Sequence, residues 1–323
     1  MNHSKALLRR LLAPICAVLL IVAAFFPYEK KAHRLRIVPG MCPAAEALLL
    51  AGDMQVLPHN RFQVIEIPWS SAVMRAFGSG AADVAVVTLD SVVRMRDAGQ
   101  KLKVLMALSQ SVGADALLAS QGLQRMEDLK GKRVGIERGA GTYLLMNALE
   151  GAGLTIDDME TVPMFQSEME QALQAGQVDA VVATEPWLTR LSRSGMHSLY
   201  DSSQLKVPIV YVLVASERAC AASRQELVSL LKVQAAMAEK IWAGKPFPGM
   251  DAVLRRERLE ADELAACLGK LHSLKAAENV KMLKHLPQMA LQMEEQMVRN
   301  RVILSRPTAS EWISRSFSEE AFR

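Results

Sequence analysis

The chain has 323 residues, of which 50 % are hydrophobic and 22 % are charged, a composition that excludes an intrinsically disordered or fibrous chain. Its length fits one large or two medium-sized domains. There are 38 basic and 34 acidic side chains; Lys5, Arg9 and Arg10 lie in residues 1–27, which hold no acid, so the remainder carries 35 against 34. A chain this close to neutral lacks the basic surface of a nucleic-acid-binding protein, so no nucleic-acid partner is expected.

The N-terminal segment, residues 1–27, has the pattern of an export signal. Its basic residues precede an apolar run, residues 11–26. Sixteen helical residues would span about 24 Å, less than the roughly 30 Å of a hydrocarbon core, which is typical of a signal peptide or a short signal-anchor. Small residues favour cleavage, but basic residues after the run leave retention equally open. We expect the rest of the chain in the periplasm or on the outer face of the cytoplasmic membrane, with membrane contact only through residues 11–26.

Strands and helices alternate through the first third of the chain. The predicted strands cover residues 35–38, 62–67, 84–87 and 104–108. The predicted helices between them cover residues 44–50, 70–77 and 91–98. Short alternating or wholly apolar runs that stop at Pro or Gly indicate the strands, and Asp90 stands where it would cap the third helix.

The middle third repeats this alternation, and the last third is helical. The predicted strands of the middle third cover residues 116–119, 133–136, 159–162, 179–183 and 207–214. Its predicted helices cover residues 143–150 and 166–175, and beyond Ser216 residues 222–243, 249–256, 261–271, 275–285 and 287–299. The pattern predicts an α/β fold of two lobes with mostly parallel sheets and a helical C-terminal tail. We assign residues 34–111 to lobe 1, 112–207 to lobe 2 and 208–323 to a return into lobe 1.

The loop at residues 137–142 is the most informative candidate site. It follows a strand and opens a helix, so its backbone amides and the helix dipole point at one place, which suits an anion or a carbonyl. Its candidate ligand contacts are Gly139, Ala140, Gly141 and Thr142. The glycine pattern of a dinucleotide site is incomplete, since Leu144 replaces its third glycine, and no Gly-Lys-Ser/Thr string is present. A tight turn without a ligand is the alternative.

Four further loops follow predicted strands and carry polar or aromatic side chains. They contribute Met41, Cys42, Trp69, Ser70, Ser71, Thr88, Asp90, Glu185 and Trp187. Ligands of open α/β sheets bind beyond the carboxyl ends of the strands, so loops from both lobes are expected to face a shared cleft. For Asp90, the alternative is a helix cap without contact to a ligand.

The cysteines and histidines indicate neither a metal site nor a disulfide framework. After the N-terminal segment only Cys42, Cys220 and Cys267 remain, an odd number with wide spacing. Cys220 and Cys267 could pair in an oxidising compartment, although buried free thiols fit better. No serine, histidine and acid combination suggests a catalytic site, and no cofactor is expected.

One stripe of sulfur-containing residues allows two interpretations. His285, Met289, Met293 and Met297 follow one another at four-residue steps on a predicted helix. Thioethers can bind Cu(I), but methionines more commonly fill an apolar core, and we expect the latter here.

A family resemblance is carried by strings in the middle of the chain. They are DLKGKRVG at 128–135, GAGTYLL at 139–145, ALEGAGL at 148–154, EQALQAGQVDA at 170–180 and EPW at 185–187, preceded by GSGAADVA at 78–85. This order resembles the solute-binding proteins of ABC importers for aliphatic sulfonates, taurine, nitrate and thiamine-precursor pyrimidines, over about residues 35–320.

The resemblance implies a type II periplasmic-binding fold, in which two α/β lobes joined by a two-strand hinge close on a small ligand. It implies a monomeric protein that captures a small organic or oxyanionic solute and delivers it to ABC permease and ATPase subunits. It places the Cys42 loop, Ser70, Thr88, Thr142 and Glu185 nearest the ligand.

The chain also departs from that family. Sulfonate binders usually have Gly-Ser where this chain has Gly139-Ala140, and their Asp-Pro-aromatic string is Glu185-Pro186-Trp187 here. An amine- or amide-bearing ligand therefore stands beside an anion as an alternative. A membrane-tethered sensor of the same fold and a same-fold enzyme are the other functional classes. The enzyme is disfavoured because the chain lacks a cysteine cluster and carries an export segment.

Overall fold

The computed structural model describes residues 34–137, 141–305 and 309–323, and the predicted N-terminal segment lies outside this range. Residues Leu35–Arg323 form one compact unit, to which the following description applies. In the described part of the chain, no helix is both long enough and apolar enough to cross a membrane.

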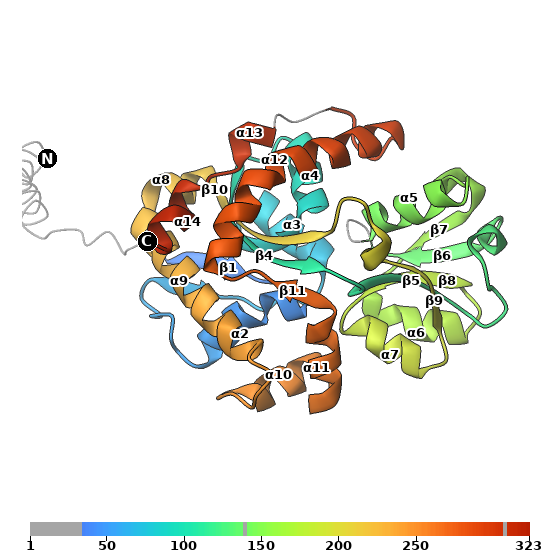
Figure 1. The fold of residues 1–323 in the computed structure, drawn as a ribbon, viewed down its shortest axis with the longest axis horizontal. Coiled ribbons are helices and arrows are strands. Elements are labelled where there is room, and N and C mark those ends of the chain that lie inside the picture. Colours follow the sequence, from blue (N-terminus) through green and yellow to red (C-terminus); the bar gives the residue numbers. More distant parts are fainter. Residues whose placement is uncertain (1–33, 138–140, 306–308) are drawn as a thin grey trace, which may run out of the picture. The chain divides into compact units, whose positions relative to one another are not determined.

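The first sheet has six strands. Their order is β11 (Leu271–Ser273), β4 (Leu102–Ser111), β10 (Val210–Ser216), β3 (Val84–Thr88), β1 (Leu35–Val38) and β2 (Phe62–Val64). The helices packed with this sheet include α2 (Glu46–Asp53), α3 (Ser70–Gly78), α4 (Leu89–Asp97), α8 (Glu217–Ala222), α9 (Arg224–Ile241), α12 (Ala276–Arg299), α13 (Ala309–Trp312) and α14 (Ser316–Ala321). Figure 1 shows that the helical last third covers this sheet, so the tail returns to the first part of the fold.

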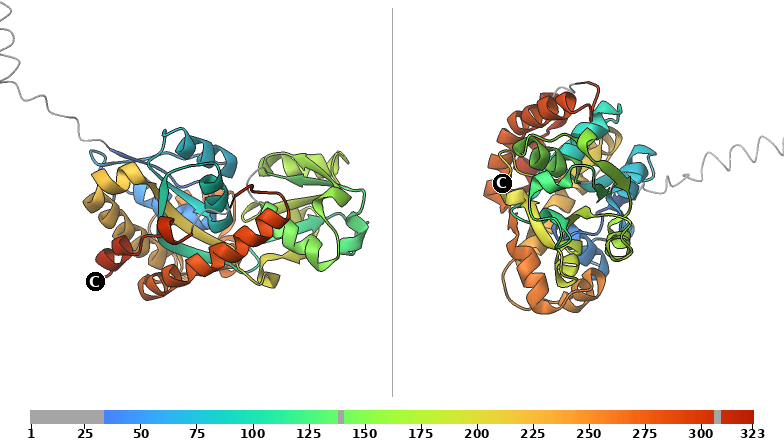
Figure 2. Two further views of the ribbon diagram at one scale, coloured as in Figure 1. Left: turned by 90° about the horizontal axis from the view of Figure 1, so that it is seen from above. Right: turned by 90° about the vertical axis from the view of Figure 1, so that its right-hand side faces the viewer.

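The second sheet has five strands. Their order is β7 (Glu160–Pro163), β6 (Arg133–Ile136), β8 (Ala180–Thr184), β5 (Asp115–Ala119) and β9 (His197–Asp201). Helix α5 (Thr142–Gly151) lies on one side of it, and α6 (Gln166–Gln174) and α7 (Trp187–Arg193) lie on the other (Figures 1 and 2). Alternate residues of β5 accordingly belong to two separate apolar clusters, Leu117 to one and Leu118 to the other.

The two-lobed α/β prediction is confirmed, but the prediction of mostly parallel sheets is wrong. Among the named strands, four pairings are parallel and five are antiparallel. The cause is the crossing between the sheets. Strand β5 begins just after the chain has left the first sheet, and β10 begins just after it returns, and each runs opposite to both of its neighbours.

Most predicted elements of the first two thirds are present, with small shifts at their ends. Strands β9 and β11 were not predicted, and β2 is shorter than expected. Helix α12 continues through Pro287, where the sequence predicted a break. Buried residues on both sides of the proline, such as Leu283 and Ala290, anchor the helix, so packing outweighs the lost backbone hydrogen bond. Helices α10 (Met250–Glu257) and α11 (Ala261–Gly269) complete the tail.

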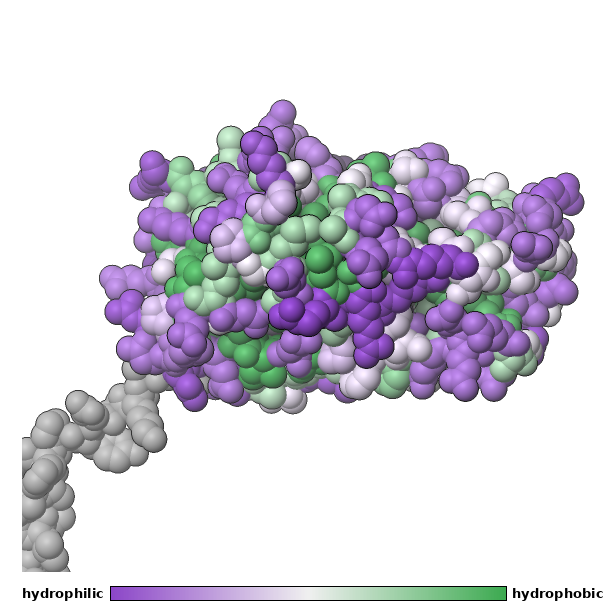
Figure 3. Space-filling model, turned by 90° about the horizontal axis from the view of Figure 1, so that it is seen from below, coloured by the Kyte–Doolittle hydropathy of each residue, from purple (hydrophilic) through white to green (hydrophobic). Residues whose placement is uncertain are grey.

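Hydrophilic and apolar residues are mixed over the face drawn in Figure 3, with apolar patches separated by hydrophilic ones. The stripe on α12 belongs to the core in part: Met293 and Met297 are buried in the main apolar cluster and Met289 packs against it, as expected, whereas His285 is exposed. No disulfide forms among the described cysteines: Cys42, Cys220 and Cys267 are free.

Both sheets use the same arginine–aspartate pair in the same place. The backbone N and Nε of Arg36 in β1 donate to Asp83 Oδ2 at 3.1 and 2.9 Å. The backbone N and Nε of Arg133 in β6 donate to Asp179 Oδ2 at 2.8 and 3.2 Å. Each aspartate directly precedes a central strand, β3 or β8, that runs parallel to the strand of its arginine, so the pair connects the starts of two neighbouring strands in each sheet.

This matched pair yields a stability prediction. Asp83 has a side chain 1 % exposed and a second partner, Arg218 at 3.0 Å, whereas Asp179 is 28 % exposed. Burial alone would raise the pKa of Asp83, but hydrogen bonds from Arg36 and Arg218 outweigh it and lower the pKa to about 2. Asp83→Ala should lower the free energy of unfolding by about 3 kcal/mol and Asp179→Ala by about 1 kcal/mol, measured by urea denaturation. Equal losses would contradict this assignment.

Candidate functional site

A cavity of about 50 Å³ lies where the ends of strands from both sheets meet. Its polar lining includes Ser70, Thr88, Asp90, Ser91, Asp115, Tyr143, Thr184 and Tyr211. Carbon and sulfur atoms of residues such as Met41, Cys42 and Leu144 complete the walls. This volume has room for about four water-sized groups, so in this conformation the cavity fits a small molecule or one head group of a larger one.

Two strand pairs place equivalent residues at the cavity. Tyr211 of β10 lies opposite Thr88 of β3, and Asp115 of β5 lies opposite Thr184 of β8. The segments 83–88 and 179–184, DVAVVT and DAVVAT, end on these threonines and follow the two arginine–aspartate pairs. The repeated pattern therefore positions one threonine from each sheet at the same site.

Hydrogen bonds cross between these pairs. The Tyr211 hydroxyl, from the first sheet, lies 3.1 Å from Thr184 Oγ1 and donates to Asp115 Oδ1 at 3.5 Å, both in the second sheet. On the other side, Thr88 Oγ1 lies 2.9 Å from Ser91 Oγ. A ligand in the cavity would contact both sheets at once.

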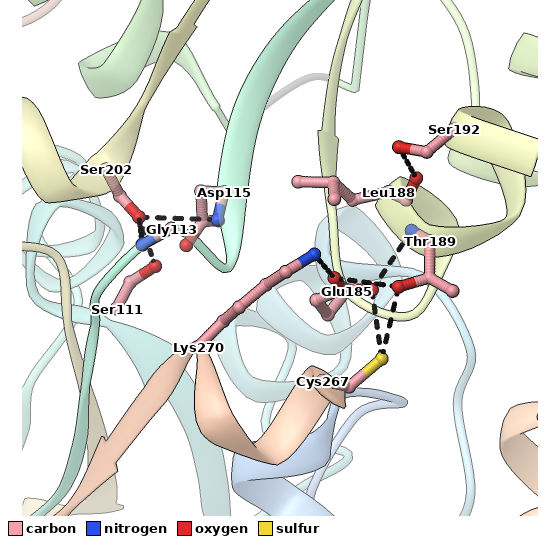
Figure 4. Close-up of polar contacts among 10 residues, drawn as sticks. All are labelled: Ser111, Gly113, Asp115, Glu185, Leu188, Thr189, Ser192, Ser202, Cys267 and Lys270. Atoms are coloured by element: carbon pink, nitrogen blue, oxygen red, sulfur yellow. Dashed lines mark hydrogen bonds and ion pairs between the residues drawn. The ribbon is translucent and has the colours of Figure 1, made fainter. Parts of the chain in front are cut away.

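Asp115 is a buried acid of the cavity with a raised pKa. It is 6 % exposed, and within the described residues its Oδ2 has no hydrogen-bond partner. Burial raises the pKa of Asp115 to about 6; the hydroxyls of Ser111, Thr184 and Tyr211 oppose this rise, and the charge of Asp90 adds to it. The Ser202 hydroxyl fixes the backbone here, because it accepts from the Asp115 backbone N at 3.4 Å and from Gly113 N at 2.8 Å (Figure 4).

Asp90 has a different environment. It is buried in the first turn of α4, where the helix dipole favours negative charge, and lies 3.6 Å from Arg94 one turn later. It does not cap the helix, because the N-cap residue is Thr88. Among the described residues that line the cavity, none is a lysine, arginine or histidine.

Cys42 lines the cavity as a neutral thiol. Burial raises its pKa well above the ordinary value, and the nearby carboxyl of Glu257 raises it further. A thiol of raised pKa is a poor nucleophile. Cys42 is therefore a small apolar wall of the site rather than a reactive group.

Three helices begin at the cavity. Ser70 opens α3, Thr88 is the N-cap of α4, and Gly141 is the N-cap of α5. Gly141 has φ +75°, and a Cβ there would lie 2.5 Å from Val182 Cγ1, so only glycine allows this close approach of the loop to β8. The amides at these helix starts favour an oxygen atom on the part of a ligand that faces them.

A second set of contacts joins the two sheets beside the cavity. The ring of Trp69, before α3, stacks on Phe165, before α6, with centroids 4.8 Å apart. The backbone N of Ser71 donates to Glu137 Oε1 at 3.1 Å. Gln166 bridges onward, donating to Glu137 Oε2 at 3.4 Å and accepting from Thr184 N at 2.9 Å. Trp69 and Ser71 thus contact the opposite part of the protein instead of lining the cavity.

Glu185 lies in a separate buried cluster (Figure 4). Its carboxylate, 1 % exposed, accepts from Lys270 Nζ at 2.6 Å and from Cys267 Sγ at 3.2 Å. It also accepts from the backbone N and the hydroxyl of Thr189 at 3.1 and 3.0 Å. The adjacent Trp187 carries the guanidinium of Arg190 over its ring at 4.4 Å.

The structure thus divides the thirteen residues that the sequence singled out. Those at the cavity are Met41, Cys42, Ser70, Thr88, Asp90 and Gly141. Those that do not line it are Trp69, Ser71, Thr142, Glu185 and Trp187, while Gly139 and Ala140 lie outside the described residues. Glu185 follows its strand as predicted, but its side chain is directed toward α11 because Lys270 and Cys267 supply its partners. Contact of any of these residues with a ligand stays a prediction.

Sequence reasoning missed Asp115, Thr184 and Tyr211. A signal existed for Thr184, because its segment repeats the one that ends on the predicted Thr88. Asp115 and Tyr211 each lie at or near the start of an apolar strand, and only the register with β8 and β3 brings them to the cavity. In the described part of the chain, no group of three or more His, Cys, Asp or Glu side chains is arranged to hold a metal ion.

Comparisons with known proteins agree with this architecture. A family model described as NMT1/THI5 like matches residues 63–240, more than half of the chain. An Escherichia coli (strain K12) protein named for binding aliphatic sulfonates is 25 % identical over 217 residues, which cover 64 % of this chain and 67 % of that protein.

Two solved structures show the same fold. The alkanesulfonate-binding protein SsuA from Xanthomonas axonopodis pv. citri, bound to MOPS, matches with a TM-score of 0.74 at 20 % identity over 88 % of this chain and 99 % of that one. The desulfurization enzyme DSZB matches with a TM-score of 0.59 at 16 % identity, over 89 % of this chain and 99 % of that one. The fold therefore occurs in binding proteins and in an enzyme.

Proposed function

The chain is a member of the NMT1/THI5-like family, and from this membership we propose that it is an extracytoplasmic solute-binding protein that holds a small solute between two lobes and delivers it to an ABC-type permease. The named relatives that bind solutes support this function. The permease and its ATPase are the partners that this function requires, and the protein would act as a monomer.

The single observation that carries the proposal is the cavity with its crossed hydrogen bonds. Its walls come from equivalent strand ends of the two sheets, and Tyr211 of one sheet bonds to Thr184 and Asp115 of the other. A solute that replaced these hydrogen bonds would couple its own binding to the closure of the lobes.

The path of the chain supports lobe boundaries near those expected. It leaves the first sheet after Ser111, enters the second at Asp115, and returns between Asp201 and Val210. We therefore propose residues 34–111 and 208–323 as lobe 1 and residues 112–207 as lobe 2. Residues 1–27 would export the chain or anchor it.

A binding role fits the site better than catalysis. The cavity thiol is neutral, and in the described residues it has no histidine beside it that could act as a base. The carboxyls, hydroxyls and helix starts of the cavity offer hydrogen bonds for recognition. The likeness to DSZB concerns the fold alone.

The test is a thermal-shift panel on the full chain in mild detergent. It would include alkanesulfonates, taurine, nitrate, bicarbonate, pyrimidines, thiamine, flavins and polyamines. A ligand present at a hundred times its dissociation constant adds about 2.7 kcal/mol, which is roughly 2–4 °C for a chain of this size. A shift with one chemical class would support the proposal. A folded protein with no shift across the panel would count against it and favour a tethered sensory module.

A further inference from the structure

One carboxylate at the cavity lacks a hydrogen-bond partner for one of its oxygens among the described residues. Asp115 is more than nine-tenths buried, Tyr211 donates to its Oδ1, and its Oδ2 has no hydrogen-bond partner among the described residues. A carboxylate removed from water is stable only when paired or hydrogen-bonded. Because Asp115 lines the cavity, the missing partner would be supplied from inside it.

The described charged side chains around the cavity do not supply the missing partner of Asp115 Oδ2. Asp90, the second carboxyl of the cavity, has Arg94 of its own helix 3.6 Å away. Among the described lining residues none is basic, and the carboxyls of Asp90 and Asp115 are the charged groups of that described lining. The other polar atoms are hydroxyl oxygens, such as those of Thr88 and Thr184, which can accept hydrogen bonds from N–H groups.

We propose that Asp115 binds a cationic, N–H-donating group of the solute, such as a guanidinium, an amidinium or a primary ammonium. The inference rests on the proposed solute-binding function and assigns a ligand class different from that in the relatives' names. A guanidinium or amidinium presents parallel N–H donors that match a carboxylate, and charge-assisted hydrogen bonds are the strong ones. A planar group of four heavy atoms is compatible with a cavity of about 50 Å³.

Three planar molecules of equal size and different charge test the proposal. Guanidinium, urea and nitrate each have four heavy atoms and carry charges of plus one, zero and minus one. Binding to the full chain would be measured by isothermal titration calorimetry at pH 8 and constant ionic strength, up to 50 mM. We expect saturable guanidinium binding at least tenfold tighter than that of urea and nitrate. Equal or tighter nitrate binding, or no saturable guanidinium binding, would overturn the proposal.

Variants locate the effect. Asp115→Asn keeps the shape and removes the charge, and should weaken guanidinium binding at least thirtyfold; unchanged binding contradicts the proposal. Asp157→Asn removes an exposed carboxylate and gives the same change in net charge, so it should leave binding within twofold. Arg138, a residue of the loop at 137–142 that lies outside the described residues, provides a further control. Nitrate binding that Arg138→Ala abolishes would reveal an anion site and refute a cation site.

A pH series remains informative if Asp115→Asn does not fold. Guanidinium affinity should fall at least tenfold between pH 8 and pH 5, because Asp115 loses its charge in this range. The groups whose charges act on Asp115 are Asp90, Tyr211 and Cys42, and the raised pKa values of Tyr211 and Cys42 keep both neutral throughout. A pH-independent affinity would refute the assignment.

The two proposals fail in different ways. An anionic solute found in the thermal-shift panel would refute the cationic group and leave the solute-binding function standing. A flat panel together with no saturable guanidinium binding would refute that function itself.

Discussion

Replacing Lys270 by methionine should lower the free energy of unfolding by about 3 kcal/mol. Lys270 Nζ lies 2.6 Å from a Glu185 carboxylate that is 1 % exposed. Methionine keeps the apolar stem and leaves the charge buried beside only Thr189 and Cys267. We place the loss at the lower end of the range for buried pairs because Lys270 is itself 35 % exposed and water can partly replace it. Urea denaturation followed by tryptophan fluorescence measures the change.

The chain offers a matched control for this substitution. Lys130 lies 3.9 Å from Asp158, and both side chains of that pair are well hydrated, so Lys130→Met should cost less than about 0.5 kcal/mol. Adding Glu185→Gln to Lys270→Met should recover most of the loss, because the double variant no longer buries an unpaired charge. Equal effects of Lys270→Met and Lys130→Met would contradict the conclusion that the ion pair of Lys270 with the buried Glu185 stabilises the fold.

The Lys270–Glu185 ion pair lies beside the segment that leads the chain from the first sheet to the second. The backbone O of Lys270 accepts from Val112 N at 2.8 Å, and Val112 follows the last residue of β4. The Lys270 side chain then bonds to Glu185 at the end of β8. The helical tail thus connects to the crossing segment through its backbone and to the second sheet through this ion pair.

Asp115→Asn should raise the stability of the unliganded protein at pH 8 while it removes binding of a cation. Burial raises the pKa of Asp115 from 3.8 to about 6. A shift of this size corresponds to up to about 3 kcal/mol at a pH above both values. The native carboxylate is therefore retained at a cost to stability, as expected of a group that serves a ligand.

The sign of the pH dependence follows from the direction of this shift. Between about pH 4 and pH 6 the folded protein binds more protons at Asp115 than the unfolded chain does. The stabilising contribution of the protonated group is fully present below pH 4 and is lost as the pH rises through about 6.

Urea denaturation of both proteins should thus show no difference near pH 4 from this source and a growing advantage of Asp115→Asn toward pH 8. The other acids titrate in both proteins and cancel in the difference. An advantage that stays constant with pH would contradict the assignment.

The sequence by itself determined the class of the fold and several of the loops that form the candidate site. Apolar runs of period two and of period 3.6 mark which side of each segment is buried, and glycine and proline mark where segments end, because both signals are local. Loops at the ends of strands could therefore be named, and those holding Cys42, Ser70, Thr88 and Gly141 do reach the cavity.

Only the tertiary structure decided which strands pair and where two carboxyls point. A strand's sequence shows that it is buried but not its neighbour or its direction, so the antiparallel insertion of β10 between β3 and β4 could not be read from it. That pairing and the pairing of β5 with β8 bring Tyr211 and Asp115 together. Glu185 follows a strand as ligand residues do, yet Lys270, 85 residues later, is its partner. Contacts between distant residues depend on packing of the whole chain, which local patterns do not encode.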